Sequence, residues 1–364
     1  MIFPPLLQLP TNLPDLTDAA LQYSHTNPPD PTTWCEVASG VYWLRMPLPF
    51  ALNHINLWLI RDEIAGRAGF TLVDTGIYDA VTQGIWQQLW RGPMQGLPIL
   101  RVICTHLHPD HFGLADWLCA HFACALWMTA GEYGIGRILS AALPGADSQR
   151  MMTHFARHGV TESSVQGELR ERGEYFSQYV PSTPTSFCRL EDGQVITIGG
   201  KVWQIIIGRG HSPEHASLFC AELALLIAGD MLLPRISTNL SVFGLEPEAN
   251  PIPQFIDSLQ RFLILPTNTL VLPSHGLPFW GIETRVTQLE IHHAERLREV
   301  LALCKEPLSA RALTALMFKR TLDIHQLSFA LGETLAHLHC LRELNLIKQS
   351  QRADGVIEFQ TVID

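Results

Sequence analysis

The sequence predicts a mixed α/β (α+β) fold in two domains. Short strand-like runs bounded by turn residues dominate the first 290 residues, and amphipathic helical segments are interspersed among them. After about residue 290 the pattern changes to helices followed by a hairpin. The 364 residues are enough for two domains, and 47% hydrophobic residues can form a large core.

The segment 34–290 is predicted to be the main domain, preceded by an irregular arm over residues 1–33 that is rich in Pro, Asn, Thr and Asp. Strands are expected at Gly40–Met46, Ile55–Arg61, Gly69–Val73, Leu100–Cys104, Val195–Ile198, Val202–Ile207, Leu223–Ala228 and Leu270–Pro273. Helical periodicity predicts helices at Tyr78–Trp90 and His111–Phe122.

Residues 131–187 are predicted to form a helical insert in this β-rich framework. Apolar spacing indicates helices around Ile135–Ala142, Met151–Phe155 and Leu169–Tyr179. An insert of this size either caps an active site or is a purely structural elaboration. Its cationic side chains are interpreted either as substrate contacts or as a solvated helix face; they are Arg150, His154, Arg157 and His158.

Residues 291–364 have the element order of a winged-helix unit, which is three helices and a hairpin. The helix Ile291–Cys304 is amphipathic, Ser309 can cap a helix ending near Phe318, and Asp323 can cap the region leading into Phe329–Leu344. Strands at Leu346–Gln349 and Val356–Val362 are expected to pair across Asp354-Gly355.

Composition excludes several classes of partner. No apolar run reaches the roughly 18 residues of a membrane helix, and the N-terminus lacks the features of a signal peptide, so we expect a cytoplasmic protein. The eight cysteines show no C-x-x-C pair, which favours buried reduced thiols. A net charge of −10 argues against a nucleic-acid partner. The segment after residue 288 carries nine Lys and Arg against ten Asp and Glu, so DNA binding by it is not expected.

The motif that carries chemistry is Thr105-His106-Leu107-His108-Pro109-Asp110-His111, directly after the strand Leu100–Cys104. Four metal-competent side chains fall within six residues of one loop. Adjacent polar groups of this kind are costly to bury without partners, so their clustering predicts a metal site.

Further ligand candidates stand where other predicted strands end. They are His211 in Gly-His-Ser-Pro-Glu-His, Asp230 in Gly-Asp, His275 in Ser-His-Gly, and Asp74 in Val-Asp-Thr-Gly. Each of these residues alone is typical of an ordinary turn. Their order after the H-x-H-x-D-H motif makes the joint pattern specific.

With these motifs the sequence resembles the metallo-β-lactamase superfamily over roughly residues 36–290, in its lactamase-beta-like or hydroxyacylglutathione-hydrolase-like branch. The resemblance implies an αββα sandwich with two metal ions at one edge. One ion would be held by His106, His108 and His211, the other by Asp110, His111 and His275, with Asp230 bridging both. Asp74, Thr105 and His215 would orient these ligands. Imidazole with carboxylate favours two zinc ions, with iron or manganese as alternatives.

The acidic residue at position 230 is unlike a true β-lactamase, and His108 argues against an oxygen-reducing di-iron site. The glyoxalase-like pattern G-H-T-P-G-H has Gly where this chain has Glu214, which affects the loop's shape. Residues 336–341, with the winged-helix order, resemble the C-terminal unit of lactamase-beta-like hydrolases. His337 and His339 are interpreted as surface or packing residues.

The resemblance implies hydrolysis of a small carbonyl substrate, which is a thioester, ester or lactone, by a metal-bridging hydroxide oriented by the catalytic carboxylates Asp110 and Asp230. The alternatives are a single-strand endoribonuclease, an iron-dependent sulfur dioxygenase and a metal-binding scaffold without turnover. His215 is a candidate proton donor as well as a candidate partner of the ligands. Asn53, His54 and Asn56 could line the site, but a polar strand face is the preferred interpretation. We expect a small-molecule substrate, neither DNA nor membrane as a partner, and a chain compatible with a homodimer.

Overall fold

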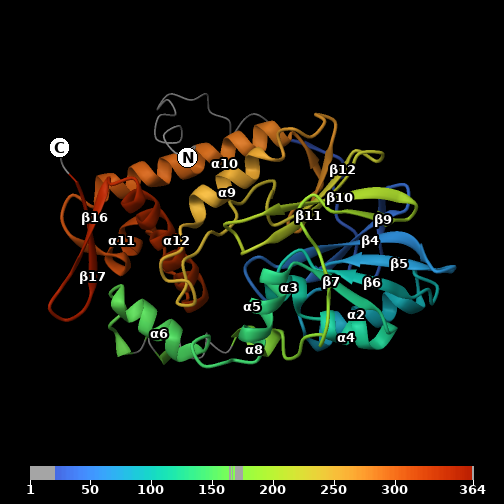
Figure 1. Ribbon diagram of the computed structural model, residues 1–364, viewed down its shortest axis with the longest axis horizontal. Helices are drawn as coiled ribbons and strands as arrows, with labels where there is room; N and C mark the ends of the chain where they lie inside the picture. Colours follow the sequence, from blue (N-terminus) through green and yellow to red (C-terminus); the bar gives the residue numbers. More distant parts are fainter. Residues whose placement is uncertain (1–20, 164, 166, 169–174, 363–364) are drawn as a thin grey trace.

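The computed structural model describes residues 21–163, 165, 167–168 and 175–362. Two seven-stranded sheets lie face to face with helices on both outer sides (Figure 1). This four-layer arrangement, followed by a small C-terminal domain, confirms the predicted αββα sandwich. Residues 1–20 of the expected N-terminal arm and residues 169–174 of the third insert helix lie outside the described residues. No helix in the described ranges is both long and apolar enough to cross a membrane.

The first sheet has the strand order β2-β3-β4-β5-β6-β7-β8. Its strands are β2 Cys35–Ala38, β3 Val41–Pro47, β4 His54–Ile64, β5 Arg67–Val73, β6 Ile99–Ile103, β7 Ala125–Met128 and β8 Cys188–Arg189. The second sheet has the order β1-β14-β13-β12-β11-β10-β9. Its strands are β1 Gln22–Tyr23, β9 Val195–Ile198, β10 Lys201–Gly208, β11 His215–Cys220, β12 Leu225–Gly229, β13 Leu270–Pro273 and β14 Phe279–Trp280.

Three hydrophobic layers hold the sandwich together. Between the sheets lie side chains such as Trp43, Trp58 and Trp203, none of them exposed. The first sheet is covered by α2 (Ala80–Arg91), α3 (Pro109–Phe112) and α4 (Ala115–Phe122), and the second by α9 (Pro251–Gln260) and α10 (Ile282–Leu303). Each strand buries alternate residues on opposite faces, so both faces of both sheets are apolar.

The helix predicted at His111–Phe122 is two helices. The backbone N–H of Leu114 donates to Gly76 O and to the Thr75 hydroxyl, instead of continuing the helical hydrogen bonds. Gly113 allows the close approach that this requires, because a Cβ there would lie 2.7 Å from Tyr78 N. A tertiary contact therefore breaks a helix that local periodicity predicts as continuous.

The insert contains α5 (Ala130–Ser140), α6 (Ser148–Arg157) and α8 (Tyr175–Tyr179). The C-terminal elements are β15 (Leu308–Ser309), α11 (Ala310–Met317), α12 (Ile324–Glu343), β16 (Ile347–Gln351) and β17 (Ile357–Thr361), which follow α10. The Ser309 and Asp323 side chains cap α11 and α12 as expected. The predicted boundary at residue 290 falls inside α10, and the winged-helix assignment stays a prediction.

The insert packs against the C-terminal domain (Figure 1). Phe155 of the insert and Leu331 of α12 are fully buried in one apolar cluster. His154 and His158 are also buried there, so a solvated helix face is the wrong interpretation for these two residues. In the C-terminal domain His337 and His339 are buried, and their Nδ1–H groups donate to the backbone carbonyls Glu333 O and Ala249 O, which supports packing and excludes a surface position.

Candidate metal centre

The loops that follow five strands meet at one edge of the sandwich. Strands β5 and β6 are parallel neighbours in one sheet, and β12 and β13 are parallel neighbours in the other. Strand β10 runs in the same direction as β12, because each is antiparallel to β11. Carboxyl ends of parallel strands share an edge, so the loops carrying the predicted ligands converge there.

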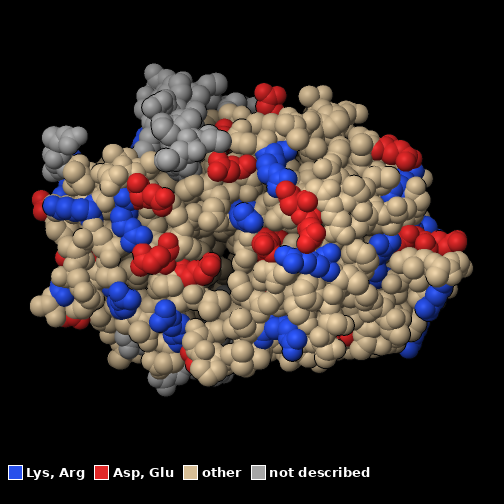
Figure 2. Space-filling model, in the orientation of Figure 1, with Lys and Arg blue, Asp and Glu red and all other residues tan. Residues whose placement is uncertain are grey.

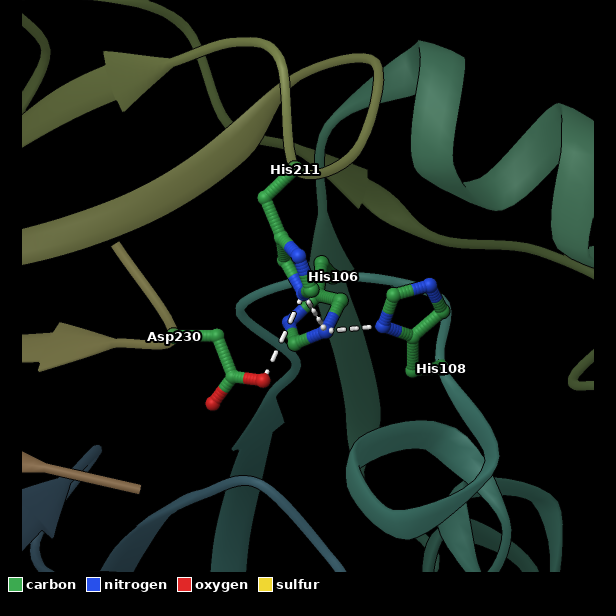
Figure 3. Close-up of side chains that lie close together, drawn as sticks. All are labelled: His106, His108, His211 and Asp230. Carbon is green, nitrogen blue, oxygen red and sulfur yellow. Dashed lines mark hydrogen bonds and ion pairs between the residues drawn. The ribbon is translucent and has the colours of Figure 1, made fainter. Parts of the chain in front are cut away.

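Three histidines form a first cluster, here called the His106 group: His106, His108 and His211. The Nε2 atom of His106 lies 2.9 Å from Nδ1 of His108 and 3.2 Å from Nε2 of His211. Figure 3 shows the three rings converging, with Asp230 beside them. His106 and His108 come from the loop after β6, and His211 from the loop between β10 and β11.

A second cluster, here called the His275 group, consists of Asp110, His111 and His275. The Asp110 carboxylate lies 3.6 Å from Nε2 of His111 and 3.4 Å from Nε2 of His275. Asp110 and His111 lie in the short helix α3, and His275 follows β13.

Asp230 lies between the two groups and faces each with a different oxygen. Its Oδ2 is 3.4 Å from Nε2 of His211, and its Oδ1 is 3.5 Å from Nε2 of both His111 and His275. A single carboxylate thus borders both clusters. The structure brings all seven predicted ligands together.

The spacing and chemistry of these donors fit metal ions. Ligand atoms bound at 2.0–2.1 Å around a tetrahedral ion stand roughly 3.3 Å apart, which is close to the separations here. One ligand atom from each of His106, His108, His211 and Asp230 lies within 4.8 Å of the other three, and the same holds among Asp110, His111 and His275. Among the described residues, His111 Nε2 and Asp230 Oδ1 are buried without a hydrogen-bond partner. Buried polar atoms are rarely left unpaired, so the His/Asp clusters are consistent with a dinuclear metal site.

Hydrogen bonds fix which nitrogen of each ring faces the site. Nδ1 of His211 lies 2.8 Å from Asn239 O, and Nδ1 of His275 lies 2.7 Å from His54 O. A carbonyl oxygen only accepts, so both Nδ1 atoms carry the proton and donate. The lone pair of each ring is therefore on Nε2, which points into the cluster.

Asp74 orients the loop after β6 through a chain of hydrogen bonds. Its carboxylate accepts from the backbone N–H of Thr105 at 2.8 Å and from Nδ1 of His111 at 2.8 Å. The Thr105 hydroxyl donates to the same carboxylate, which leaves its oxygen to accept from Nδ1 of His106 at 3.0 Å. Asp74 and Thr105 thus lie within hydrogen-bond distance of Nδ1 of His111 and of His106, respectively.

His215 is buried beneath the site. Its Nε2 accepts the backbone N–H of Asp230 at 3.1 Å, and its ring is fully buried. It therefore supports Asp230, and it is not positioned to deliver a proton to a substrate. Of the two interpretations of His215, the structure favours the partner of a ligand.

The electrostatics of the two groups differ. Burial and the neighbouring rings, His211 first, lower the pKa of His108 to about 3, and burial also lowers the pKa of His106, so these two rings are neutral. Burial opposes protonation of His111 as well, but Asp74, Asp110 and Asp230 outweigh it and raise the pKa to about 10. The negative carboxylates around the His275 group therefore keep a proton on His111. Two bound cations would displace that proton and neutralise the negative charge of the carboxylates.

Several supporting residues were missed or misassigned from the sequence. Asn56 is fully buried, and its amide donates to Pro273 O and Gly276 O on either side of His275. His54 accepts the Gly276 N–H at 2.9 Å. A polar strand face is thus the wrong interpretation for His54 and Asn56, which hold the His275 loop; only Asn53 is exposed. Alternating polarity along a strand does not reveal a buried partner more than 200 residues away.

Glu132 carried no signal in the sequence, because a single Glu in a helical insert is unremarkable. It is fully buried and accepts the backbone N–H groups of Leu107 and Glu214. The Glu214 carboxylate in turn accepts the Gly131 N–H at 2.8 Å. The departure from Gly at position 214 therefore anchors the loop to the first turn of α5.

Comparisons with known proteins agree with this fold and site. The family described as "Metallo-beta-lactamase superfamily" matches residues 52–275, and the one described as "Metallo-beta-lactamase-like, C-terminal domain" matches residues 297–362. The first match covers more than half of the chain, so this protein belongs to the metallo-β-lactamase superfamily and is a metal-dependent hydrolase of that superfamily.

A solved beta-lactamase domain protein from Burkholderia ambifaria is 47% identical, with a TM-score of 0.88 over 94% of this chain and 98% of that chain. The probable metallo-hydrolase YqjP of Bacillus subtilis (strain 168) is 24% identical over 305 residues, covering 82% of this chain and 91% of that protein. The acyl-coenzyme A thioesterase MBLAC2 of Gallus gallus is 26% identical over 245 residues, covering 66% and 78%.

Proposed function

We propose that this chain is a dinuclear zinc hydrolase that acts on a small carbonyl substrate, of which a thioester fits best. The observation that carries the proposal is Asp230, whose two carboxylate oxygens face the His106 group and the His275 group separately. His106, His108 and His211 would hold one ion, and Asp110, His111 and His275 the other. Nitrogen and oxygen donors of this kind suit zinc, with iron and manganese as the alternatives.

Two such ions, when bound, supply Lewis acidity and lower the pKa of a water that they share. The carboxylates of Asp110 and Asp230 border the same space, so they can accept hydrogen bonds from a water there and set its orientation. Buried hydrogen bonds to Asp74, Asn239 O and His54 O keep the rings from rotating. These residues thus hold the attacking water and the ligands in one geometry before the substrate arrives.

The leaving group favours a thioester. A thiolate leaves without much help from a general acid, whereas an alkoxide normally needs a positioned proton donor. His215, the one proton donor suggested by the sequence, is buried and bonded to the backbone of Asp230. The similarity to a protein named as an acyl-coenzyme A thioesterase supports the same choice.

Charge argues against RNA as the substrate. The chain has a net charge of −10, and Figure 2 shows acidic and basic side chains intermixed on the face drawn, without a continuous basic stretch. A single-stranded polyanion is normally held by a basic groove with stacking aromatics. Single-strand endoribonuclease activity therefore remains the alternative that the substrate assay has to test.

The metal assignment makes a direct prediction. The purified protein should carry close to two transition-metal ions per chain, measured by elemental analysis, and Asp230→Ala should lose occupancy at both sites together with most activity. His121→Ala, a change of an exposed histidine outside both groups, should retain both ions. An Asp230→Ala protein with two tightly bound ions and full turnover would refute the bridging role.

The substrate is tested with one zinc-loaded preparation assayed against acyl-thioesters, lactones, simple esters and an unstructured RNA. His108→Ala is the matched control, because it removes one ligand without changing the surface charge. We expect metal-dependent thioester hydrolysis that is lost in the control. Metal-dependent RNA cleavage with no hydrolysis of any carbonyl substrate would overturn the proposal.

A further inference from the structure

The first turn of the insert is bonded directly to both loops of the His106 group. Glu132 of α5 accepts the backbone N–H of Leu107 at 2.9 Å with one carboxylate oxygen and that of Glu214 at 2.7 Å with the other. Leu107 is the residue between His106 and His108. Glu214 is three residues after His211 and directly precedes His215.

Two further bonds run in the opposite direction. The Glu214 carboxylate accepts the Gly131 N–H at 2.8 Å, and the Thr129 hydroxyl donates to Glu214 O at 2.9 Å. Three bonds therefore join the first turn of α5 to Glu214 and one joins it to Leu107, and we refer to Thr129, Gly131, Glu132, Leu107 and Glu214 as the Glu132 clasp. Gly131 also lacks the Cβ that would lie 2.9 Å from the Glu214 carboxylate.

Burying a carboxylate in this position costs free energy of folding, so its presence indicates that the fold needs a specific geometry here. Glu132 has no exposed surface, and burial raises its pKa although the backbone N–H groups of Glu214 and Leu107 oppose the shift. Burying an acidic group without a cation beside it loses its hydration. What the fold gains is a fixed distance between two loops, to which the hydrogen bond from the Ala216 N–H to Thr105 O at 2.8 Å also contributes.

We propose that Glu132 is a positioning residue for the metal centre. By fixing the Leu107 peptide it sets the directions of His106 and His108, and by fixing Glu214 it sets the loop that carries His211. The insert thus shapes the His106 group from outside the sandwich, in addition to packing on the C-terminal domain. This inference rests on the proposed function, because it requires that the His106 group bind a metal ion.

The test is the stepwise affinity of the protein for zinc, measured by chelator competition. In Glu132→Gln the amide keeps one accepting oxygen but turns an NH₂ group toward the other backbone N–H, so one bond becomes a donor–donor contact. Loss of such supporting bonds typically weakens metal affinity about 10- to 100-fold. We expect a loss of that size in the step that disappears in His108→Ala, with a smaller change in the other step. The visible spectrum of the cobalt(II)-loaded variant should change as well.

Asp62→Asn is the matched control. Asp62 is also a buried carboxylate (6% exposed) that accepts a backbone N–H, that of Gly199 at 2.8 Å, but it lies at the opposite edge of the sandwich. We expect Asp62→Asn to lower the Tm and leave both zinc steps and the cobalt spectrum unchanged. If Glu132→Gln behaves in the same way, the clasp is merely structural and the inference is wrong.

If Glu132→Gln does not fold, Glu214→Ala carries the test, because it removes only the bond from Gly131. It should weaken the same zinc step several-fold, and unchanged affinity would overturn the inference. The proposed function fails separately: a wild-type chain that binds no metal refutes the metal centre, whereas two normal zinc steps with insensitive variants refute only the role of Glu132.

Discussion

At the scale of single residues, the histidine rings of the candidate metal centre are oriented by hydrogen-bond acceptors that have no proton to donate. The Nδ1–H of His211 donates to Asn239 O, that of His275 to His54 O, and that of His111 to the Asp74 carboxylate. In each ring Nε2 is therefore left as the ligand atom. Each of these acceptors comes from a different segment of the chain. The geometry of the rings is therefore determined by two backbone carbonyls that lie outside the sequence motifs and by the side chain of Asp74, which the Val-Asp-Thr-Gly motif includes.

Asp74→Asn tests this arrangement. Asp74 has a positive φ of 62°, which Asn tolerates, so the backbone should not change. The single oxygen of the Asn amide cannot accept from both the Thr105 N–H and Nδ1 of His111, so one of the two bonds that hold this loop and its ring is lost. We expect zinc affinity in the His275 group to fall about 10- to 100-fold in chelator competition. Asp79→Asn, which alters the cap of α2 on the Thr82 N–H, is the control and should leave zinc affinity unchanged. Equal affinities in all three proteins would contradict the role of Asp74.

At the scale of elements, helix α12 of the C-terminal domain supports the loop between β12 and α9. Gly332 of α12 accepts the Val242 N–H at 3.1 Å, and a Cβ at Gly332 would lie 2.7 Å from the Ser241 side chain. The same loop carries Asn239, whose carbonyl orients His211. A helix more than 80 residues further along the chain thus limits where this ligand can lie.

Two Gly→Ala substitutions separate helix propensity from this contact. Alanine stabilises a helix interior by about 0.5–1 kcal/mol relative to glycine, and a Cβ at Gly134 of α5 meets nothing within 4 Å. We expect Gly134→Ala to raise the free energy of unfolding by that amount. Gly332→Ala should instead lower it by about 1–3 kcal/mol, because the methyl group overpacks against Ser241. Urea denaturation of both variants measures the difference. Stabilisation by both would show that the contact between α12 and Ser241 adjusts to the added methyl group without loss of stability.

At the scale of the whole molecule, the insert and the C-terminal domain form one hydrophobic unit with buried histidines in it. His158 is 5% exposed, its ring stacks on Phe359, and its backbone oxygen accepts the Arg311 N–H. Burial first, and then the nearby His154, lower the pKa of His158 to about 3; burial likewise lowers the pKa of His154 to about 4. Other cationic or titratable neighbours, His339, Arg157 and Arg342, act on His158 in the same direction.

Stability should therefore depend on pH through His158. In the unfolded chain His158 binds a proton near pH 6.5, but in the folded chain it does not. The contribution of His158 to the free energy of unfolding is therefore fully present above that pH and is lost as the pH falls toward the folded pKa. We expect metal-free His158→Gln to lose less stability than the wild type between pH 6.5 and 4, by at most about 1.4 kcal/mol per pH unit. Exposed His121→Gln should follow the wild type. Parallel pH curves for all three proteins would show that His158 is protonated in the folded state.

The C-terminal domain should not bind duplex DNA. Leu335, Leu338 and Leu341 of α12 are fully buried, as the apolar face of this helix predicts, and α12 packs against α9, α10 and α11. A recognition helix needs an exposed face and basic neighbours. We expect no salt-dependent change in fluorescence anisotropy with a labelled duplex between 50 and 200 mM salt. Sub-micromolar binding that weakens with salt would contradict this.

Most of the fold could be predicted from the sequence, because its signals are local. The strands Val195–Ile198 and Leu270–Pro273 and the caps Ser309 and Asp323 lie where periodicity and capping chemistry place them. Two elements gave no such signal and were not predicted: β7, which has four residues, and β11, which is buried throughout. The ten-residue helix α9 was also not predicted, although it is amphipathic. The break at Leu114 was missed for a different reason, because its hydrogen bonds go to Thr75 and Gly76 rather than to its own helix.

The sequence by itself determined the seven candidate ligands and their order, because a dense motif and residues at strand ends are visible along the chain. Only the tertiary structure decided how they are held. Glu132, Asn56 and the carbonyl of Asn239 act through hydrogen bonds to residues 25 or more positions away. Such bonds depend on where two loops meet once both sheets have packed, and a residue that serves as their acceptor needs no distinctive neighbours in sequence.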